Sequence, residues 1–185
     1  MNSLIHAFFS NKFLSIPALV VVVSMLGGCA TPTTSQGMTP ASIKTTNQHA
    51  KSASVAVAGG QETDATGKSK ISNVVFTQAL TDSIKNSKVF SSIIQGKGAD
   101  YLLTVTMFNM DQPSFGASFT VKMEAGWTLQ RADTGAVVWQ ESIKSEHTAM
   151  MSDAFVGVER LRLATEGAAK NNISLGLSKI STLKL

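Results

Sequence analysis

The residues from Phe119 to Gln130 alternate between apolar side chains and polar or glycine residues. Because successive side chains of a β-strand point to opposite faces, this alternation predicts a strand with one buried face. The turn Ala132–Gly135 follows, and its glycine suits the positive φ of a type I turn with a bulge. When the two ends of this turn face each other, the facing pairs are Lys122 with Glu146, Glu124 with Lys144, Ala125 with Ile143, and Leu129 with Trp139. Opposite charges then meet on one face and apolar side chains on the other, which predicts a β-hairpin in this register.

Glu141 interrupts this pattern, because it falls on the core-facing side of the second strand, opposite Trp127. A carboxylate buried there needs a partner or a raised pKa. A β-bulge that turns the side chain outward removes the conflict, and we expect such a bulge at Glu141.

Three further apolar stretches predict strands, and two stretches with apolar residues at helical spacing predict helices. The strands are expected at 54–57, 89–94 and 100–110, and the helices at about 71–84, capped by Ser69 or Ser72, and at 155–180. Two helices over one face of a mostly antiparallel sheet of about five strands form an α+β two-layer sandwich, which is the predicted fold class.

An apolar run from Phe13 to Leu26 lies behind a short, weakly basic segment at the amino terminus. As a helix this run would span roughly 20 Å, against about 30 Å for the hydrocarbon of a bilayer. The run is therefore too short for a comfortable membrane-spanning anchor and suits the core of a signal peptide.

The run ends in Leu26-Gly27-Gly28-Cys29, which contains the only cysteine of the chain and resembles the lipobox of bacterial lipoproteins. The resemblance implies a diacylglycerol on the Cys29 sulfur, cleavage after Gly28 and an acyl chain on the new amino group. Buried acyl chains contribute about 0.8 kcal/mol per methylene, so stable anchoring to a membrane is expected, and we expect no other cofactor. Ala30, rather than aspartate, after the cysteine resembles the default sorting to the outer membrane, with the domain facing the periplasm. The alternative is an ordinary signal peptide with an incidental cysteine.

The lipobox divides the chain into three parts: residues 1–28 as the signal peptide, 29–52 as the acylated cysteine with a tether, and 53–185 as a periplasmic domain. The tether is rich in Thr, Ser, Pro, Gln and Asn and nearly free of large apolar side chains. It is expected to stay a flexible coil with a mean reach of about 25–30 Å.

The lipobox, the polar segment and the order of strands and helices resemble a group of small bacterial lipoproteins. The YajG-like lipoproteins are the nearest in layout. The domain is also similar to those of penicillin-binding-protein activator lipoproteins and to the amino-terminal part of the curli-secretion lipoprotein. This resemblance covers residues 53–185 and implies a fold and a compartment, but it assigns no functional residue beyond Cys29.

The sequence contains no residue pattern that indicates catalysis. His49 lies in the expected tether and His147 at a strand end, and neither has a serine, aspartate or second histidine at a catalytic spacing. No pair of ligands has the spacing of a metal site, and the paired glycines lack a phosphate-loop pattern. The net charge of +4 comes from scattered lysines, which does not indicate nucleic acid as a partner. We therefore expect a binding protein without enzymatic activity.

Methionine and phenylalanine gather at one end of the predicted sheet. The candidate partner-binding residues are Phe108, Met110, Phe115, Met150 and Met151. Phe108 and Met110 have the parity of the sheet face opposite Trp127, and surfaces rich in methionine adapt to varied apolar partners. The alternative is core packing under the closing helix, which accounts less well for Phe115, Met150 and Met151 because they lie in connections.

These features predict an outer-membrane-anchored lipoprotein that acts as a non-catalytic accessory subunit of an envelope transport or assembly complex. Three alternatives stay open. The first is an activator of a peptidoglycan synthase, and the second is a carrier of lipid or another hydrophobic ligand between the helices and the sheet. The third is a homo-oligomer in which Gly157 and Gly167 of the closing helix allow a second protomer to approach.

Overall fold

The computed structural model describes residues 30–65 and 68–185. The predicted signal peptide and the predicted acylation of Cys29 lie outside the described residues, so both stay predictions.

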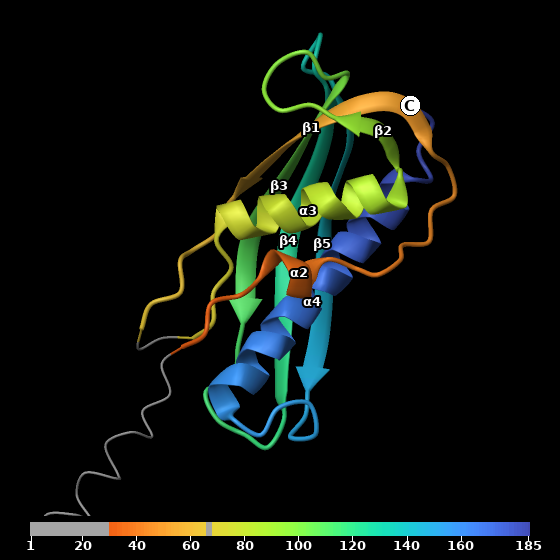
Figure 1. Cartoon of the computed structure of the whole chain (residues 1–185). Coiled ribbons are helices and arrows are strands. Elements are labelled where there is room, and N and C mark those ends of the chain that lie inside the picture. The colour runs from red at the N-terminus through yellow and green to blue at the C-terminus, as the bar shows by residue number, and fades with distance from the viewer. Residues whose placement is uncertain (1–29, 66–67) are drawn as a thin grey trace, which may run out of the picture.

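Five strands form one sheet in the order β2-β1-β3-β4-β5 (Figure 1). The strands are β1 His49–Ala58, β2 Phe90–Ile93, β3 Tyr101–Asp111, β4 Phe119–Arg131 and β5 Val137–Ala149. β1 runs parallel to β2 and β3, whereas β3, β4 and β5 form an antiparallel meander. The helices α3 Asn73–Ser87 and α4 Gly157–Ile180 cover one face of this sheet, and the short helix α2 Ser35–Met38 contacts both (Figure 1). The predicted α+β two-layer fold is confirmed.

The hairpin of β4 and β5 has the predicted register. Lys122 faces Glu146, and Leu129 faces Trp139. Gly135 adopts a φ of 70°, the left-handed value that the turn requires. The register shifts by one residue next to Leu129, so the bulge of this hairpin lies beside the turn.

The predicted bulge at Glu141 is wrong, because Glu141 pairs regularly with Trp127 and stays on the helix-covered face. β5 is the edge strand, so an inward side chain there can stay partly open to solvent. The Glu141 side chain is 39% exposed, and its Oε1 accepts a hydrogen bond from Lys179 Nζ at 2.6 Å. An edge position with a lysine partner resolves the conflict that a bulge was expected to resolve.

The space between the helices and the sheet is filled by side chains. Trp127 is fully buried at its centre, and its Nε1 donates to Asn172 Oδ1 at 2.9 Å. A Cβ atom at Gly176 of α4 would lie 2.5 Å from ring atoms of Trp127, so the helix needs glycine there. Phe76 and Met38 are also fully buried. A hydrophobic ligand between the layers, as one alternative requires, would have to displace these side chains.

Residues 30–48 pack against the domain, so the prediction of a flexible tether is wrong for this segment. It contains α2, whose Met38 is fully buried, and it leads directly into β1 at His49, four residues before the expected domain boundary. Composition predicted disorder because the segment has almost no apolar side chains. The segment is held instead by Met38 and by hydrogen bonds to distant parts of the chain.

Candidate functional site

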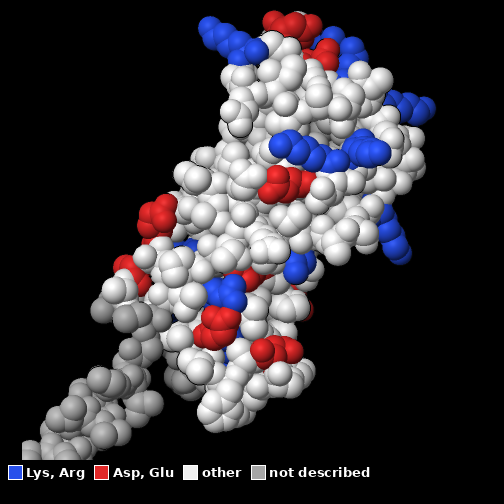
Figure 2. Space-filling view, viewed as in Figure 1, with Lys and Arg blue, Asp and Glu red and all other residues white. Residues whose placement is uncertain are grey.

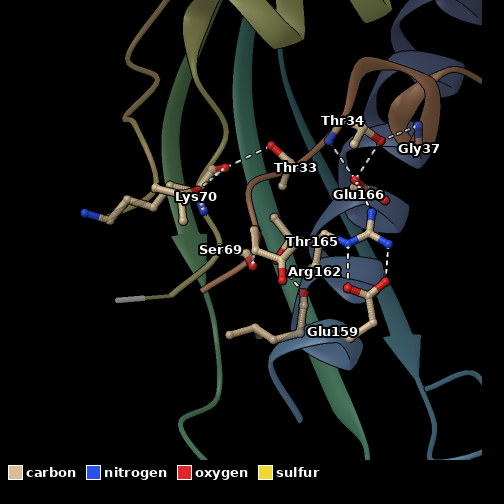
Figure 3. Close-up of polar contacts among 12 residues, drawn as sticks. Thr33, Thr34, Gly37, Ser69, Lys70, Glu159, Arg162, Thr165 and Glu166 are labelled. Atoms are coloured by element: carbon tan, nitrogen blue, oxygen red, sulfur yellow. Dashed lines mark hydrogen bonds and ion pairs between the residues drawn. The ribbon is translucent and has the colours of Figure 1, made fainter. Parts of the chain in front are cut away.

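Glu166, in the middle of α4, holds the amino-terminal segment on the domain (Figure 3). Its Oε1 accepts the backbone N–H of Thr34 at 2.7 Å and the Thr34 hydroxyl at 2.9 Å. The same oxygen accepts a hydrogen bond from Arg162 at 2.7 Å, and the Glu166 side chain is only 4% exposed. Arg162 also donates to Glu159, and this hydrogen bond lowers the pKa of the Glu159 carboxyl and raises the pKa of Arg162. We call Thr34, Arg162 and Glu166 the clamp.

The residues before the clamp are fixed against the loop between β1 and α3. Ser69 Oγ donates to the carbonyl of Thr31 at 2.8 Å, and Thr33 Oγ1 donates to the carbonyl of Lys70 at 2.9 Å (Figure 3). Gln112, at the end of β3, donates from Nε2 to the carbonyl of Ser69 at 2.6 Å. The start of the described chain is therefore tied to the start of the loop between β3 and β4.

The far end of the same segment is fixed at the carboxyl end of α4. The N–H of Asn47 donates to the carbonyl of Ser181 at 3.0 Å, and the N–H of Thr46 donates to Ser181 Oγ at 2.9 Å. His49 is buried in β1, with Nε2 lying 3.0 Å from the carbonyl of Ile180, and it does not lie in a tether as expected. The segment is thus held at both ends.

Two loops at one end of the sheet present large apolar side chains to solvent. They connect β3 to β4 and β5 to α4, and they lie at the bottom of Figure 1. We define the apolar tip as five residues with these exposed fractions: Phe115 88%, Met150 57%, Met151 49%, Phe155 82% and Val156 57%. The lowest part of the molecule shows no charged side chain on the face in Figure 2. Phe115, Met150 and Met151 lie in these two loops and are surface residues, and their role in binding a partner stays a prediction.

Arg160 joins the two loops of the apolar tip. Its guanidinium donates to the carbonyls of Ala154 at 2.8 Å and Phe155 at 3.1 Å in one loop, and to the carbonyl of Gly116 at 3.1 Å in the other. The group is buried and lies 4.9 Å from the centroid of the Phe119 ring. Arg160 therefore fixes the backbone that presents the exposed phenylalanines.

We expect Arg160→Lys to loosen both loops without unfolding the sheet. A lysine cannot make three hydrogen bonds in the fixed geometry of a guanidinium, and hydrogen bonds from charged groups contribute about 1.5–3 kcal/mol. Backbone amides of residues 114–118 and 150–156 should exchange roughly tenfold faster by mass spectrometry, while those of α3 stay unchanged. Equal exchange in the variant and the native protein would show that the loops do not depend on Arg160.

Phe108 and Met110 lie in β3 and not in the two loops of the apolar tip. The pairing of β3 with β4 shifts between Met107 and Asn109, so Phe108 is the extra residue of a β-bulge. Phe108 is 63% exposed on the face without helices, as predicted. Met110 is partly buried against the core, so its predicted parity is wrong. A bulge adds one residue, and one residue reverses the face of every side chain after it.

The sheet face around Phe108 is uncharged over three neighbouring rows of residues. Across β1, β3, β4 and β5 these rows are Ser54-Leu102-Gln130-Val137, Ala56-Thr104-Thr128-Gln140 and Ala58-Thr106-Gly126-Ser142. None of these residues is buried. The Phe108 ring lies on Gly126, where a Cβ atom would be 2.5 Å from the ring. We call this surface the open sheet face.

Gly167 of α4 was expected to allow the close approach of a second protomer. The ring of His147 occupies the space that a side chain at Gly167 would fill, so this glycine serves an internal contact and offers no room to a second protomer.

Within residues 30–65 and 68–185, no group of three or more His, Cys, Asp or Glu side chains lies close enough to hold a metal ion. In the same part of the chain, no helix combines the length and the apolar character needed to cross a membrane.

Sequence reasoning missed Glu166 and Arg160. In the sequence, Arg162 and Glu166 form an ordinary pair four residues apart on a helix, a spacing that is typical of exposed surfaces. Arg160 has no local signal at all, since its acceptors lie in two loops. Glycine at position 37 was one indirect sign of the clamp, because a side chain there would meet the Glu166 carboxylate.

No protein-family model and no curated protein matched the sequence. Among solved structures, protein XCC0632 of the DUF330 family from Xanthomonas campestris matches with a TM-score of 0.61 and 11% identity, covering 82% of this chain and 95% of that one. The PelC dodecamer from Paraburkholderia phytofirmans matches with a TM-score of 0.50 and 15% identity, covering 77% and 95%. A putative lipoprotein from Caulobacter crescentus matches with a TM-score of 0.49 and 17% identity, covering 70% and 88%. The chain thus shares its fold with XCC0632 and, more distantly, with PelC.

Proposed function

We propose that this chain is a lipoprotein, acylated on Cys29 and held at the periplasmic side of the outer membrane. In this proposal it binds a protein subunit of an envelope transport or assembly complex and performs no catalysis. The lipobox supports the anchor. The observation that carries the binding role is the open sheet face with its exposed phenylalanine.

The open sheet face suits a protein partner. A half-covered antiparallel sheet usually places polar side chains toward water, and the serine, threonine and glutamine side chains of the three rows follow that pattern. The rows carry no charge, however, and Phe108 beside them is 63% exposed. Protein interfaces are depleted in charge at their centre and enriched in aromatic side chains, which matches this composition. The charged pair of Glu124 with Lys144 borders the uncharged rows, as a polar rim borders an interface.

The two alternatives within the envelope receive less support. An activator of an inner-membrane synthase must reach far from its anchor, whereas residues 30–48 are packed on the domain and supply no reach. A lipid carrier would need space between the layers, which Trp127 and Phe76 occupy.

Photo-crosslinking in intact cells tests the proposal. With a crosslinking residue at Thr104, in the open sheet face, we expect capture of a transport or assembly subunit that mass spectrometry identifies. A crosslinker at Leu175, 44% exposed on α4, is the control and should not capture that subunit. Capture of the same species from both positions, or capture of nothing from Thr104, would reject the open sheet face as the binding surface.

The variant Phe108→Asp should reduce the capture from Thr104 by roughly tenfold, because truncating a central aromatic side chain commonly costs more than 1.4 kcal/mol of binding free energy. The fold should be unchanged, since the side chain is mostly exposed. A melting temperature equal to that of the native chain checks this point. Unchanged capture from the Phe108→Asp variant would show that the partner does not use this side chain.

A further inference from the structure

The apolar tip differs in composition from the rest of the surface. Among residues 112–118 and 150–156, only Asp153 carries a charge, and no lysine or arginine is present. The Asp153 carboxylate is itself engaged, because Oδ2 accepts the N–H of Met150 at 2.7 Å. Any surface that binds here is therefore recognised by apolar contact and not by attraction of charges.

Several backbone polar groups of the tip are already paired. Arg160 satisfies the carbonyls of Gly116, Ala154 and Phe155. The carbonyl of Met150 accepts the N–H groups of Asp153 at 3.0 Å and Ala154 at 3.3 Å. An unpaired amide or carbonyl is costly to transfer from water into hydrocarbon, and internal pairing removes that cost for these groups. For these paired groups, the polar penalty of leaving water is small.

The described chain begins close to the tip. Ser69 is hydrogen-bonded to the carbonyl of Thr31, and Gln112 is hydrogen-bonded to the carbonyl of Ser69. Phe115 follows Gln112 by three residues, a reach of about 10 Å at most. Cys29 precedes Ala30 directly, so the predicted acylation site is one peptide unit from a position that is fixed on this half of the molecule. Figure 1 shows the start of the described chain and the two loops in the same lower half.

We propose that the apolar tip inserts into the lipid bilayer to which Cys29 is anchored. Phe115, Phe155 and Met150 then make a second membrane contact, which sets the orientation of the domain on the surface. The inference rests on the proposed acylation of Cys29 and is independent of the partner at the open sheet face. Because the tip has no cationic side chain, it binds zwitterionic lipid and its insertion is insensitive to salt.

Spin labelling of the full-length acylated protein tests this inference. The Cys29 sulfur is blocked by lipid, so a cysteine introduced as Phe155→Cys is the single reactive thiol for a nitroxide. The protein is reconstituted in vesicles of phosphatidylethanolamine and phosphatidylcholine, and its intact mass reports whether the acyl chains are present. Val137→Cys is the control, since Val137 is 55% exposed at the opposite end of the sheet.

We expect the label at residue 155 to collide preferentially with oxygen, which concentrates in hydrocarbon, and the label at 137 to collide preferentially with a water-soluble nickel chelate. Phe115→Ser in the Phe155→Cys background should shift the label at 155 toward the nickel chelate. Phe115 is 88% exposed, so this change should leave the melting temperature unaltered. Raising the salt from about 0.1 M to about 1 M should leave both readings unchanged.

Two results would overturn the inference when the mass shows an acylated protein. Nickel access at 155 equal to that at 137 would place the tip in water. Protection of 155 from both oxygen and nickel would place it against protein, as in an interface with a second copy of the chain. A mass without acyl chains would instead refute the proposed anchor, and with it the ground for insertion.

Discussion

Replacement of Glu166 by alanine is expected to lower the free energy of unfolding by about 3 kcal/mol and to release residues 30–38 from the domain. Its Oε1 is the shared acceptor of the Thr34 amide, the Thr34 hydroxyl and Arg162. Removing one partner of a buried ion pair costs about 3–5 kcal/mol. The lower figure applies here because Arg162 keeps its ion pair with Glu159. Chemical denaturation measures the loss, and hydrogen exchange of the amides at 34–38 measures the release.

Glu159→Gln is the matched control for this prediction. It weakens the ion pair of Arg162 with its other partner on the same helix. The Glu159 side chain is 36% exposed, and it is not part of the clamp. Half-exposed ion pairs contribute about 0–1 kcal/mol, so the control should keep the slow exchange at 34–38. If the two variants behave alike, Glu166 does not hold the segment.

Trp127→Ala should cost about 3–5 kcal/mol of unfolding free energy, the range for truncating a large buried aromatic side chain. Trp127 is fully buried between β4 and α4, and its loss also leaves Asn172 Oδ1 without the indole donor. Thermal and denaturant unfolding of the purified chain measure this effect. A cost below about 1 kcal/mol would show that the helix collapses onto the sheet without this ring.

The close contact of Trp127 with α4 gives the prediction an independent check. Gly176→Ala should destabilise by about 1–3 kcal/mol, although alanine is the better helix former, because the added methyl meets the indole ring. Gly157→Ala in the same helix is the control, since the nearest atom to its Cβ, on Phe119, is 4.0 Å away, and it should be neutral or stabilising. Combining Gly176→Ala with Trp127→Phe should cost less than the sum of the two single changes.

The sequence allowed prediction of the parts whose determinants are local. The register of the hairpin follows from charge pairs and a glycine turn, and the cap of α3 follows from Ser72, whose Oγ accepts the N–H of Val75 at 3.3 Å. The face of Met110 could not be predicted, because nothing in the sequence marks the bulge at Phe108 that reverses it. The packing of residues 30–48 depends on Glu166, more than one hundred residues away in the chain. Composition cannot report such a contact.

The attachment of residues 30–48 to α4 has a consequence for how partners are encountered. A domain on a long coil samples a thick layer of the periplasm, whereas a domain clamped beside its own anchor stays within its own height of the bilayer. For the proposed acylated protein, a partner in the same leaflet is then met at a high effective concentration, on the order of millimolar for short connections. Soluble partners gain nothing from this confinement. By keeping the domain close to the bilayer, the clamp limits which proteins the domain can meet, whatever surface it binds them with.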